Sequence, residues 1–191
     1  MFSDKFSNNS SFRVVCSKKL NSRKHILKNI HYLTLEEIED NIQQGLACYE
    51  YLAKFIKNRR AYFHISRISN LSNPVEFFKN MVYKFARFCE IECDVKFTLT
   101  HNPCSNSYYV YTNLYTEDVE QMKNLVVKFA NLHKSYNISC SIYNQSQLLR
   151  LPYSSLPNST SDSNTNTSTF LLCSTPFMIQ DTFNCHLITK H

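Results

Sequence analysis

Carboxylates, cysteines and histidines are the residues of this 191-residue chain that could do chemistry, and their spacing limits what they can do. Two-metal catalysis needs acidic side chains on one face, usually as Asp-x-Asp on a strand, because alternate strand residues point the same way. The sequence contains no Asp-x-Asp, and Asp94 is the one aspartate at the edge of an expected strand. The acidic residues therefore predict no metal-dependent polymerase site.

Two cysteine patterns come closest to a zinc site: Cys89-x-x-x-Cys93, and Cys185-His186 with His191. A structural zinc ion takes four ligands, and no second close pair completes either set. Cys89 also falls on the apolar stripe of an expected helix, which favours a buried thiol. The eight cysteines are scattered and no secretory signal precedes them, so we expect an intracellular protein with free thiols, no metal site and no cofactor.

The single glycine, Gly45, excludes several nucleotide-binding and catalytic loops. A dinucleotide-binding turn, a phosphate-binding P-loop and a nucleophile elbow each require two or more glycines at fixed spacing. No apolar run approaches the roughly 20 residues that a transmembrane helix needs, so no membrane partner is expected.

Basic residues alternate with aromatic ones along the expected strands. The set is Arg59, Arg60, Arg67, Lys96, Tyr108, Tyr109, Tyr111, Tyr143 and Arg150. With a net charge of +6, it fits a nucleic-acid partner, because rings stack on bases and cations contact phosphates. The same aromatics favour strands and pack cores, so binding and simple packing both remain open.

Hydrophobic spacing predicts the elements that would position these side chains. A capping box at Thr34 and Glu37 opens a helix whose apolar rhythm continues to about Asn58, with Gly45 inside it. Helices are also expected from Pro74 to Phe88 and after Thr116. Strands are expected at 61–66, 94–99, 108–112, 138–143 and 148–151, and a further one is possible at 170–177.

The order β-α-β-β-α-β over residues 61–143 predicts an α+β protein with a ferredoxin-like core, two helices covering one face of an antiparallel sheet. RNA-recognition modules use the open face of such a sheet to stack bases. The expected segments are a loosely docked basic arm plus helix at 1–58, the core at 59–153, a disordered polar insert at 154–169 and a C-terminal segment at 170–191.

Three segments follow one another in an order that resembles a known family. They are Tyr62-Phe-His64-Ile-Ser66, Ser107-Tyr-Tyr109-Val-Tyr111, and the stretch from Ser139 through Tyr143 to Arg150-Leu-Pro152. Together they resemble the archaeo-eukaryotic primase superfamily, especially primases of large DNA viruses such as the baculovirus late-expression-factor primase. The resemblance covers about residues 59–155 and implies an RRM-like primase core.

The resemblance also implies that the metal-binding and phosphate-binding residues of the family are replaced in this chain. The family's paired metal-binding aspartates correspond to His64 and Ser66, its phosphate-binding histidine to Tyr109, and its third aspartate to Ser139. The family's serine and arginine remain as Ser107 and Arg150. Without the carboxylates nothing would hold two divalent cations, so the expectation is a primase-like protein of viral DNA replication without primer synthesis. Mg or Mn would be a cofactor only if the family activity were retained.

Nucleic-acid binding is the activity that would remain. Arg150 and Lys96 are expected to contact phosphate, and Ser107 and Tyr111 to take part in binding on a tyrosine-rich sheet face. The implied partners are single-stranded DNA or RNA and a primase large subunit or replication factor, in the host nucleus or at the site of viral replication.

Two alternatives remain open at this stage. The chain could be an active DNA primase that uses other carboxylates, namely Glu90, Glu92 and Asp94. It could also be an unrelated RRM-like module, which would expose two aromatic residues on adjacent central strands and bind single strands. A remnant that has lost its partners is a further interpretation.

Overall fold

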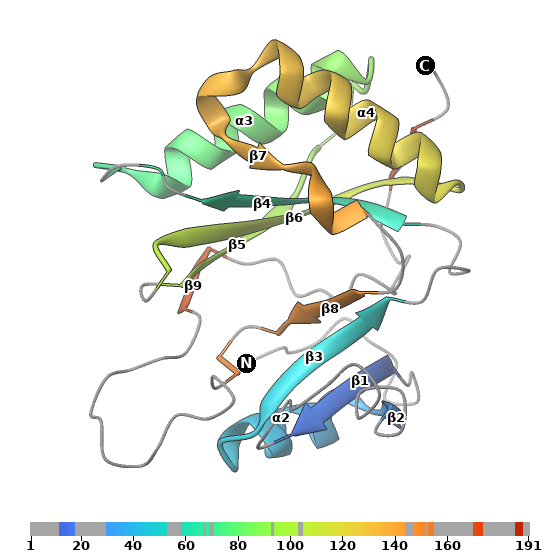
Figure 1. Cartoon of the computed structure of the whole chain (residues 1–191), viewed down its shortest axis with the longest axis vertical. Coiled ribbons are helices and arrows are strands. Elements are labelled where there is room, and N and C mark those ends of the chain that lie inside the picture. Colours follow the sequence, from blue (N-terminus) through green and yellow to red (C-terminus); the bar gives the residue numbers. More distant parts are fainter. Residues whose placement is uncertain are drawn as a thin grey trace. The chain divides into compact units, whose positions relative to one another are not determined.

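The computed structural model describes residues 12–17, 30–52, 59–66, 68, 71–92, 94–102, 105–143, 147–151, 153–154, 170–173 and 186–188 (Figure 1). Within these residues the chain is mixed α+β. It divides into two compact units, one of Met1–Lys54 with Ser146–Phe170 and one of Phe55–Gln145 with Leu171–His191. None of the helices in the described part is long and apolar enough to cross a membrane.

The first unit is an antiparallel sheet with one helix. Its strands pair in the order β2-β1-β3-β8, and helix α2 contacts β1, β2 and β3. The elements are β1 (Phe12–Ser17), β2 (Ile30–Leu33), α2 (Leu35–Gln43), β3 (Ala47–Leu52) and β8 (Gln147–Arg150). Ile38 is the buried residue of α2, and Val14 and Val15 of β1 are fully buried.

The predicted long helix from Thr34 to Asn58 is wrong after Gln43 as far as Leu52, and residues 53–58 lie outside the described part of the chain. It begins as predicted, since the Thr34 hydroxyl accepts the Glu37 N–H (3.3 Å) and the Glu37 carboxylate accepts the Thr34 N–H (2.7 Å). However, the helix ends at Gln43, and Gly45 adopts a left-handed φ of +76°, which a glycine takes at little cost after a helix. The next residues form β3 instead.

The loosely docked arm expected at the N-terminus is also wrong for the residues described there. Phe12–Ser17 forms β1, a central strand that pairs with β2 on one side and β3 on the other. Its Phe12, Val14 and Val15 are buried. A short apolar run reads as a strand only once its pairing partners are known, and here both partners lie farther along the chain.

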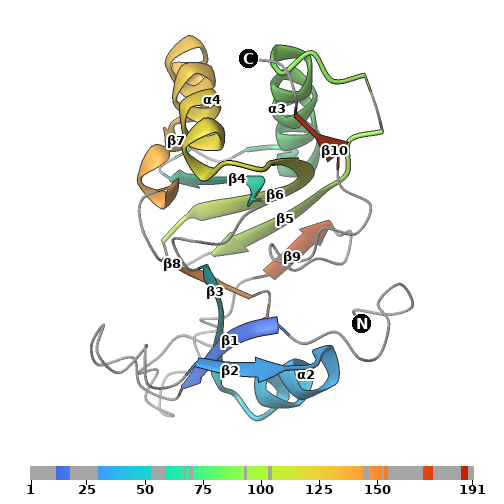
Figure 2. The same cartoon turned by 90° about the vertical axis from the view of Figure 1, so that its right-hand side faces the viewer.

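The second unit is built on a sheet with two helices on one face, as Figures 1 and 2 show. The sheet order is β7-β4-β6-β5-β9, and β10 pairs in parallel with β6. The elements are β4 (Arg59–Ser66), α3 (Pro74–Phe88), β5 (Phe97–Asn102), β6 (Ser107–Thr116), α4 (Val119–Leu132), η1 (Lys134–Tyr136), β7 (Ile138–Ser139), η2 (Cys140–Tyr143), β9 (Phe170–Cys173) and β10 (His186–Leu187).

An aromatic cluster joins the helices to the sheet. Phe63 of β4 meets Phe85 of α3 edge-on, with ring centroids 5.1 Å apart, and lies 6.4 Å from Phe129 of α4. Phe85 and Phe129 are themselves 5.2 Å apart. All three are fully buried, as the predicted apolar stripes of both helices require, but Leu132, which was expected at the end of the α4 stripe, is exposed.

Among the strands whose limits differ from the prediction, two have a limit at which a side chain satisfies the backbone. The strand expected at 94–99 begins at Phe97, since the Asn113 side chain accepts the Lys96 N–H (2.9 Å) and donates to the Asp94 carbonyl (3.3 Å). The strand expected at 138–143 ends at Ser139 and continues as the 3₁₀ turn η2. That turn brings the Tyr143 hydroxyl back to the β4 backbone.

Several predicted features fall on residues that the structure does not describe. The polar insert at 154–169 lies outside the described residues apart from Ser154. The same holds for Arg67, Cys93, Cys185 and His191, and for the side chains of Arg59 and His186.

The apolar stripe of α4 provides a stability test with a matched control on the same helix. Leu125 is 6% exposed and Leu132 is 68% exposed. Leu125→Ala leaves a cavity against the sheet and is expected to lower the free energy of unfolding by about 2–5 kcal/mol. Leu132→Ala should change it by no more than about 0.5 kcal/mol. Urea unfolding followed by circular dichroism measures both, and equal losses would contradict the packing described.

Candidate functional site

The face of the second sheet that α3 and α4 leave uncovered carries polar and aromatic side chains. On β4, Phe63 faces the helices, so His64 and its alternate neighbours face the other way. On β6, Tyr108 packs against Phe78 of α3, with ring centroids 4.9 Å apart, so Tyr109 also faces away from the helices. We call this surface the polar face. Its members on these two strands are Tyr62, His64, Ser66, Ser107, Tyr109 and Tyr111.

His64 and Tyr109 form the centre of the polar face. They lie directly opposite each other on β4 and β6, and their rings stack with centroids 4.7 Å apart and planes within 16°. Ser139 of β7 lies opposite His64 on its other side, and Thr100 of β5 lies opposite Tyr109. Four strands thus contribute one continuous row of side chains.

The His64 ring is half-buried, and this burial sets its charge. Removing the ring from water disfavours the imidazolium form and lowers the pKa of His64 below its ordinary value of 6.5. The ring is therefore neutral at pH 7. The stack of His64 and Tyr109 is a contact between two uncharged aromatic rings. Tyr109, Ser66 and Ser139 are half-buried as well.

Beside this row the polar face is packed rather than exposed. Tyr62 is fully buried and Tyr111 is 3% exposed, with their ring centroids 6.5 Å apart. The Tyr143 hydroxyl accepts the Tyr62 N–H (2.8 Å) and donates to the Tyr62 carbonyl (2.6 Å). Its ring lies 4.7 Å from that of Tyr62. Around Tyr62, Tyr111 and Tyr143, the strand aromatics therefore pack a core, which is the second of the two interpretations that the sequence left open.

The residues predicted to bind nucleic acid are not equally placed for it. Tyr111 is buried, and the hydroxyl of the buried Ser107 lies 2.6 Å from that of Ser105. Lys96 is exposed just before β5. Arg150 lies opposite Tyr49 in the sheet of the first unit.

The structure therefore brings together, on one face, the positions that the sequence assigned to the site from β4, β6 and β7. These are His64, Ser66, Ser107, Tyr109, Tyr111 and Ser139. It does not place Arg150 in the same unit.

Three members of the polar face were missed by the sequence analysis. Thr98, Thr100 and Asn102 of β5 lie opposite Tyr111, Tyr109 and Ser107, and all three are buried. Their polar alternation with Phe97, Leu99 and His101 was the available signal. Thr100 and Asn102 were missed because the strand was expected to end at Leu99, whereas Thr98 lay within the expected strand and was not singled out.

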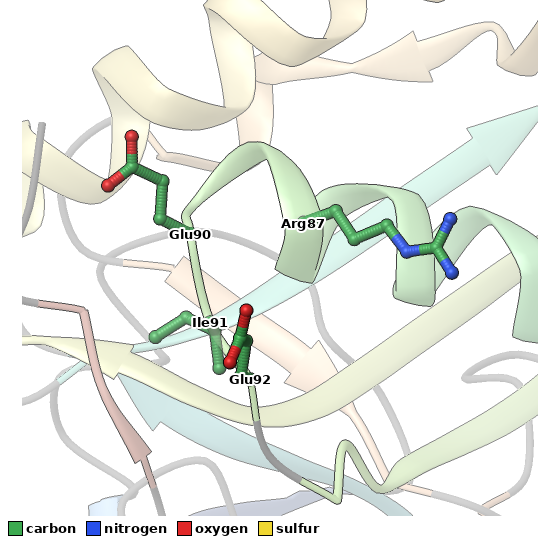
Figure 3. A pocket seen from close by; sticks show the side chains of 4 residues that line it. All are labelled: Arg87, Glu90, Ile91 and Glu92. Atoms are coloured by element: carbon green, nitrogen blue, oxygen red, sulfur yellow. The ribbon is translucent and has the colours of Figure 1, made fainter.

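The alternative carboxylate set gains no geometric support. A depression of about 580 Å³ lies at the C-terminal end of α3. It is lined by Arg87, Glu90, Ile91 and Glu92. Figure 3 shows the carboxylates of Glu90 and Glu92 pointing in different directions and Arg87 extending away from both. No group of three or more His, Cys, Asp or Glu side chains that could hold a metal ion occurs within the described part of the chain.

The Cys89 thiol is buried at the C-terminal end of α3, as its place on the apolar stripe predicted. Burial raises the pKa of Cys89 to about 12, because the thiolate would lose its hydration there. This thiol is therefore protonated and unreactive at neutral pH.

Comparison with known proteins gives no match: no protein-family model fits the sequence, and no curated protein is significantly similar to it. Any assignment of function has to be argued from the polar face itself.

The half-buried His64 ring predicts a pH dependence of stability. As pH falls below 6.5, the unfolded chain protonates this histidine while the folded chain, whose His64 pKa is lowered, does not. The unfolded state then binds more protons, so acid lowers the free energy of unfolding. His64→Phe keeps a ring opposite Tyr109 but cannot titrate, and should lose less stability between about pH 7.5 and 5.5.

Urea unfolding at the two pH values measures this difference. His31→Gln, which removes an exposed histidine on β2, is the control and should keep the wild-type dependence. If His64→Phe loses as much stability in acid as wild type, the described burial of His64 is contradicted.

Proposed function

We propose that this chain is a single-stranded nucleic-acid-binding protein built on a primase-like, RRM-like sheet, and that it does not synthesise primers. The observation that carries the proposal is the stacked pair of His64 and Tyr109 on adjacent strands of the polar face. Both rings are half-buried, and they stack on each other with the geometry in which an aromatic ring also stacks on a base.

The order of the strands supports this proposal. In the sequence β4-α3-β5-β6-α4-β7, the first and third strands are neighbours at the centre, the fourth flanks the first and the second flanks the third. RNA-recognition modules carry their base-stacking aromatics on one open face of a four-stranded sheet. His64 on β4 and Tyr109 on β6 occupy the two central strands here.

The primase resemblance is supported by the common location of the residues that were matched to the family. His64, Ser66, Tyr109 and Ser139 were matched to the family's active-site positions from separate sequence segments, and they lie on the same face of three adjacent strands. None of them is a carboxylate. A primase-like protein with these four residues would lack the carboxylate ligands that two divalent cations need.

Chemically, the polar face would bind a strand through stacking and hydrogen bonds. A neutral His64 and Tyr109 offer ring faces to the bases, while the Ser66 and Ser139 hydroxyls offer hydrogen bonds to base edges or sugars. Lys96 is exposed, and the net charge of +6 attracts the phosphate backbone. Viral DNA replication, with a large-subunit or replication-factor partner, is the setting that the primase resemblance implies.

Removing the central ring should weaken binding of single strands. Tyr109→Ala deletes one stacking face, and the loss of about 1–3 kcal/mol per stacked base corresponds to a roughly 5- to 150-fold weaker affinity. Fluorescence anisotropy with labelled oligo-dT and oligo-U at low salt measures this loss. Lys96→Ala should reduce the salt dependence of binding by about one phosphate contact.

The matched control is Tyr83→Ala, because Tyr83 is a 38% exposed tyrosine on α3, away from the polar face. It should leave affinity unchanged. An affinity that is equally weak in both tyrosine variants, or no binding by the wild-type chain, would overturn the proposed function.

Primer synthesis should be absent. With a single-stranded template, nucleotides and either Mg or Mn, purified protein is expected to make no primers, because the described residues of the polar face include no carboxylates to hold the metal ions. Products resolved on a sequencing gel provide the measurement. Synthesis that is abolished by Glu92→Gln or Asp94→Asn would instead establish the alternative carboxylate site.

A further inference from the structure

The first unit holds two cysteines in a geometry that the proposed function does not use. Cys16 of β1 and Cys48 of β3 lie directly opposite each other in the antiparallel pair. Their Sγ atoms are 3.1 Å apart, within hydrogen-bonding distance. Cys16 is half-buried and Cys48 is buried, so Cys16 is the more accessible of the two thiols.

This pair meets the geometric requirements of a disulfide. Residues directly opposite in an antiparallel pair have Cα atoms about 4.5–5.5 Å apart, inside the range of about 4.4–6.8 Å that a disulfide spans. The sulfur atoms need to approach by about 1 Å to reach a bond length of about 2.05 Å. Side-chain torsions can supply that movement without changing the register of β1 and β3.

We propose that Cys16 and Cys48 are a redox-modification site, at which hydrogen peroxide produces a reversible cross-strand disulfide. The inference rests on the strand register and the position of the two sulfurs. It is independent of whether the second unit binds nucleic acid.

The chemistry proceeds in two balanced steps. The Cys16 thiolate attacks one oxygen of hydrogen peroxide, the O–O bond breaks, and the products are Cys16 sulfenic acid and, after proton uptake, water. The Cys48 sulfur then attacks the Cys16 sulfur, the S–O bond breaks, and a second water leaves with the Cys48 proton. Two thiols lose two electrons in all, and one peroxide gains them. A small thiol reductant reverses the reaction by exchange.

The surroundings favour Cys16 as the attacking sulfur. A hydrogen bond from the Cys48 thiol stabilises the Cys16 thiolate and lowers the pKa of Cys16, while the same bond and burial raise the pKa of Cys48. Burial raises the pKa of Cys140 and of Cys89, so these two thiols are poorer nucleophiles. Peroxide is therefore expected to select Cys16 among these four thiols.

Cys48 is already fixed in place on its backbone side. The Ser154 hydroxyl accepts the Cys48 N–H (2.8 Å) and donates to the Cys48 carbonyl (3.0 Å). The Leu151 N–H donates to the same carbonyl (3.0 Å). A disulfide would tie β1 to this anchored position and close the loop of residues 16–48, which restricts the unfolded chain and stabilises the folded one.

Tryptic peptide mapping tests the proposal directly, because each cysteine falls on its own peptide. Cleavage at Lys and Arg places Cys16 on residues 14–18 and Cys48 on residues 29–54, each with no other cysteine. Reduced protein is treated with hydrogen peroxide, remaining thiols are alkylated, and the digest is analysed by mass spectrometry. We expect the two peptides joined, about 2 Da lighter than their sum, and separated again by dithiothreitol.

Variants decide whether the bond has the proposed effect. Wild-type protein should unfold at a higher temperature after oxidation than after reduction, and Cys16→Ser should show no such difference. Cys140→Ser, which removes another half-buried thiol, is the matched control and should keep both the joined peptides and the shift. Cys48→Ala serves as the second variant if Cys16→Ser does not fold by circular dichroism.

The proposal is overturned if peroxide-treated, folded wild-type protein yields no joined peptides, or if Cys16 is found linked to a different cysteine. It is equally overturned if Cys140→Ser removes the joined peptides.

Discussion

The burial of Phe63 between the two helices is the interaction on which the polar face depends. Successive strand residues point to opposite sides, so placing Phe63 against Phe85 and Phe129 fixes His64 on the other side of the sheet. A slip of one residue in β4 would bury the histidine among phenylalanines and expose Phe63. The position of His64 is thus a consequence of core packing, and no contact of its own is needed to set it.

The pairing of β4 with β6 is irregular where Ala61 of β4 lies opposite residues 112–114 of β6. The pairing of β4 with β6 shifts between Arg60 and Tyr62, which would leave backbone groups of the bulge unpaired. The Thr112 hydroxyl fills this gap, because it donates to the Ala61 carbonyl (2.9 Å) and accepts the Leu114 N–H (3.2 Å). Beyond the shift, Tyr62, His64 and Ser66 lie opposite Tyr111, Tyr109 and Ser107. One buried threonine therefore supports the register that stacks His64 on Tyr109.

The sequence predicted the elements whose signals are local and failed where a distant partner decides the structure. The caps at Asn73 and Asp118 and the apolar stripes of α3 and α4 lie within single helices, and these helices were predicted correctly. By contrast, β1 needs β2 and β3, and the shortening of the strand at Ser139 depends on a hydrogen bond between Tyr143 and Tyr62. The strand before Leu151 was expected, but only pairing shows that Arg150 lies beside Tyr49. Thr100 and Asn102 were missed for the same reason, because their place on the polar face depends on the pairing of β5 with β6.

The absence of carboxylates among the described residues of the polar face fits its proposed use in binding. Three half-buried carboxylates without metal ions would repel a phosphate backbone, since a low-dielectric face strengthens like-charge repulsion. With His64, Ser66 and Ser139 in those positions the row is neutral, because burial also keeps the His64 ring unprotonated at pH 7. A strand could then approach without divalent cations to neutralise the face. A neutral row would therefore let the sheet bind a strand through stacking and hydrogen bonds, as we propose, without metal ions.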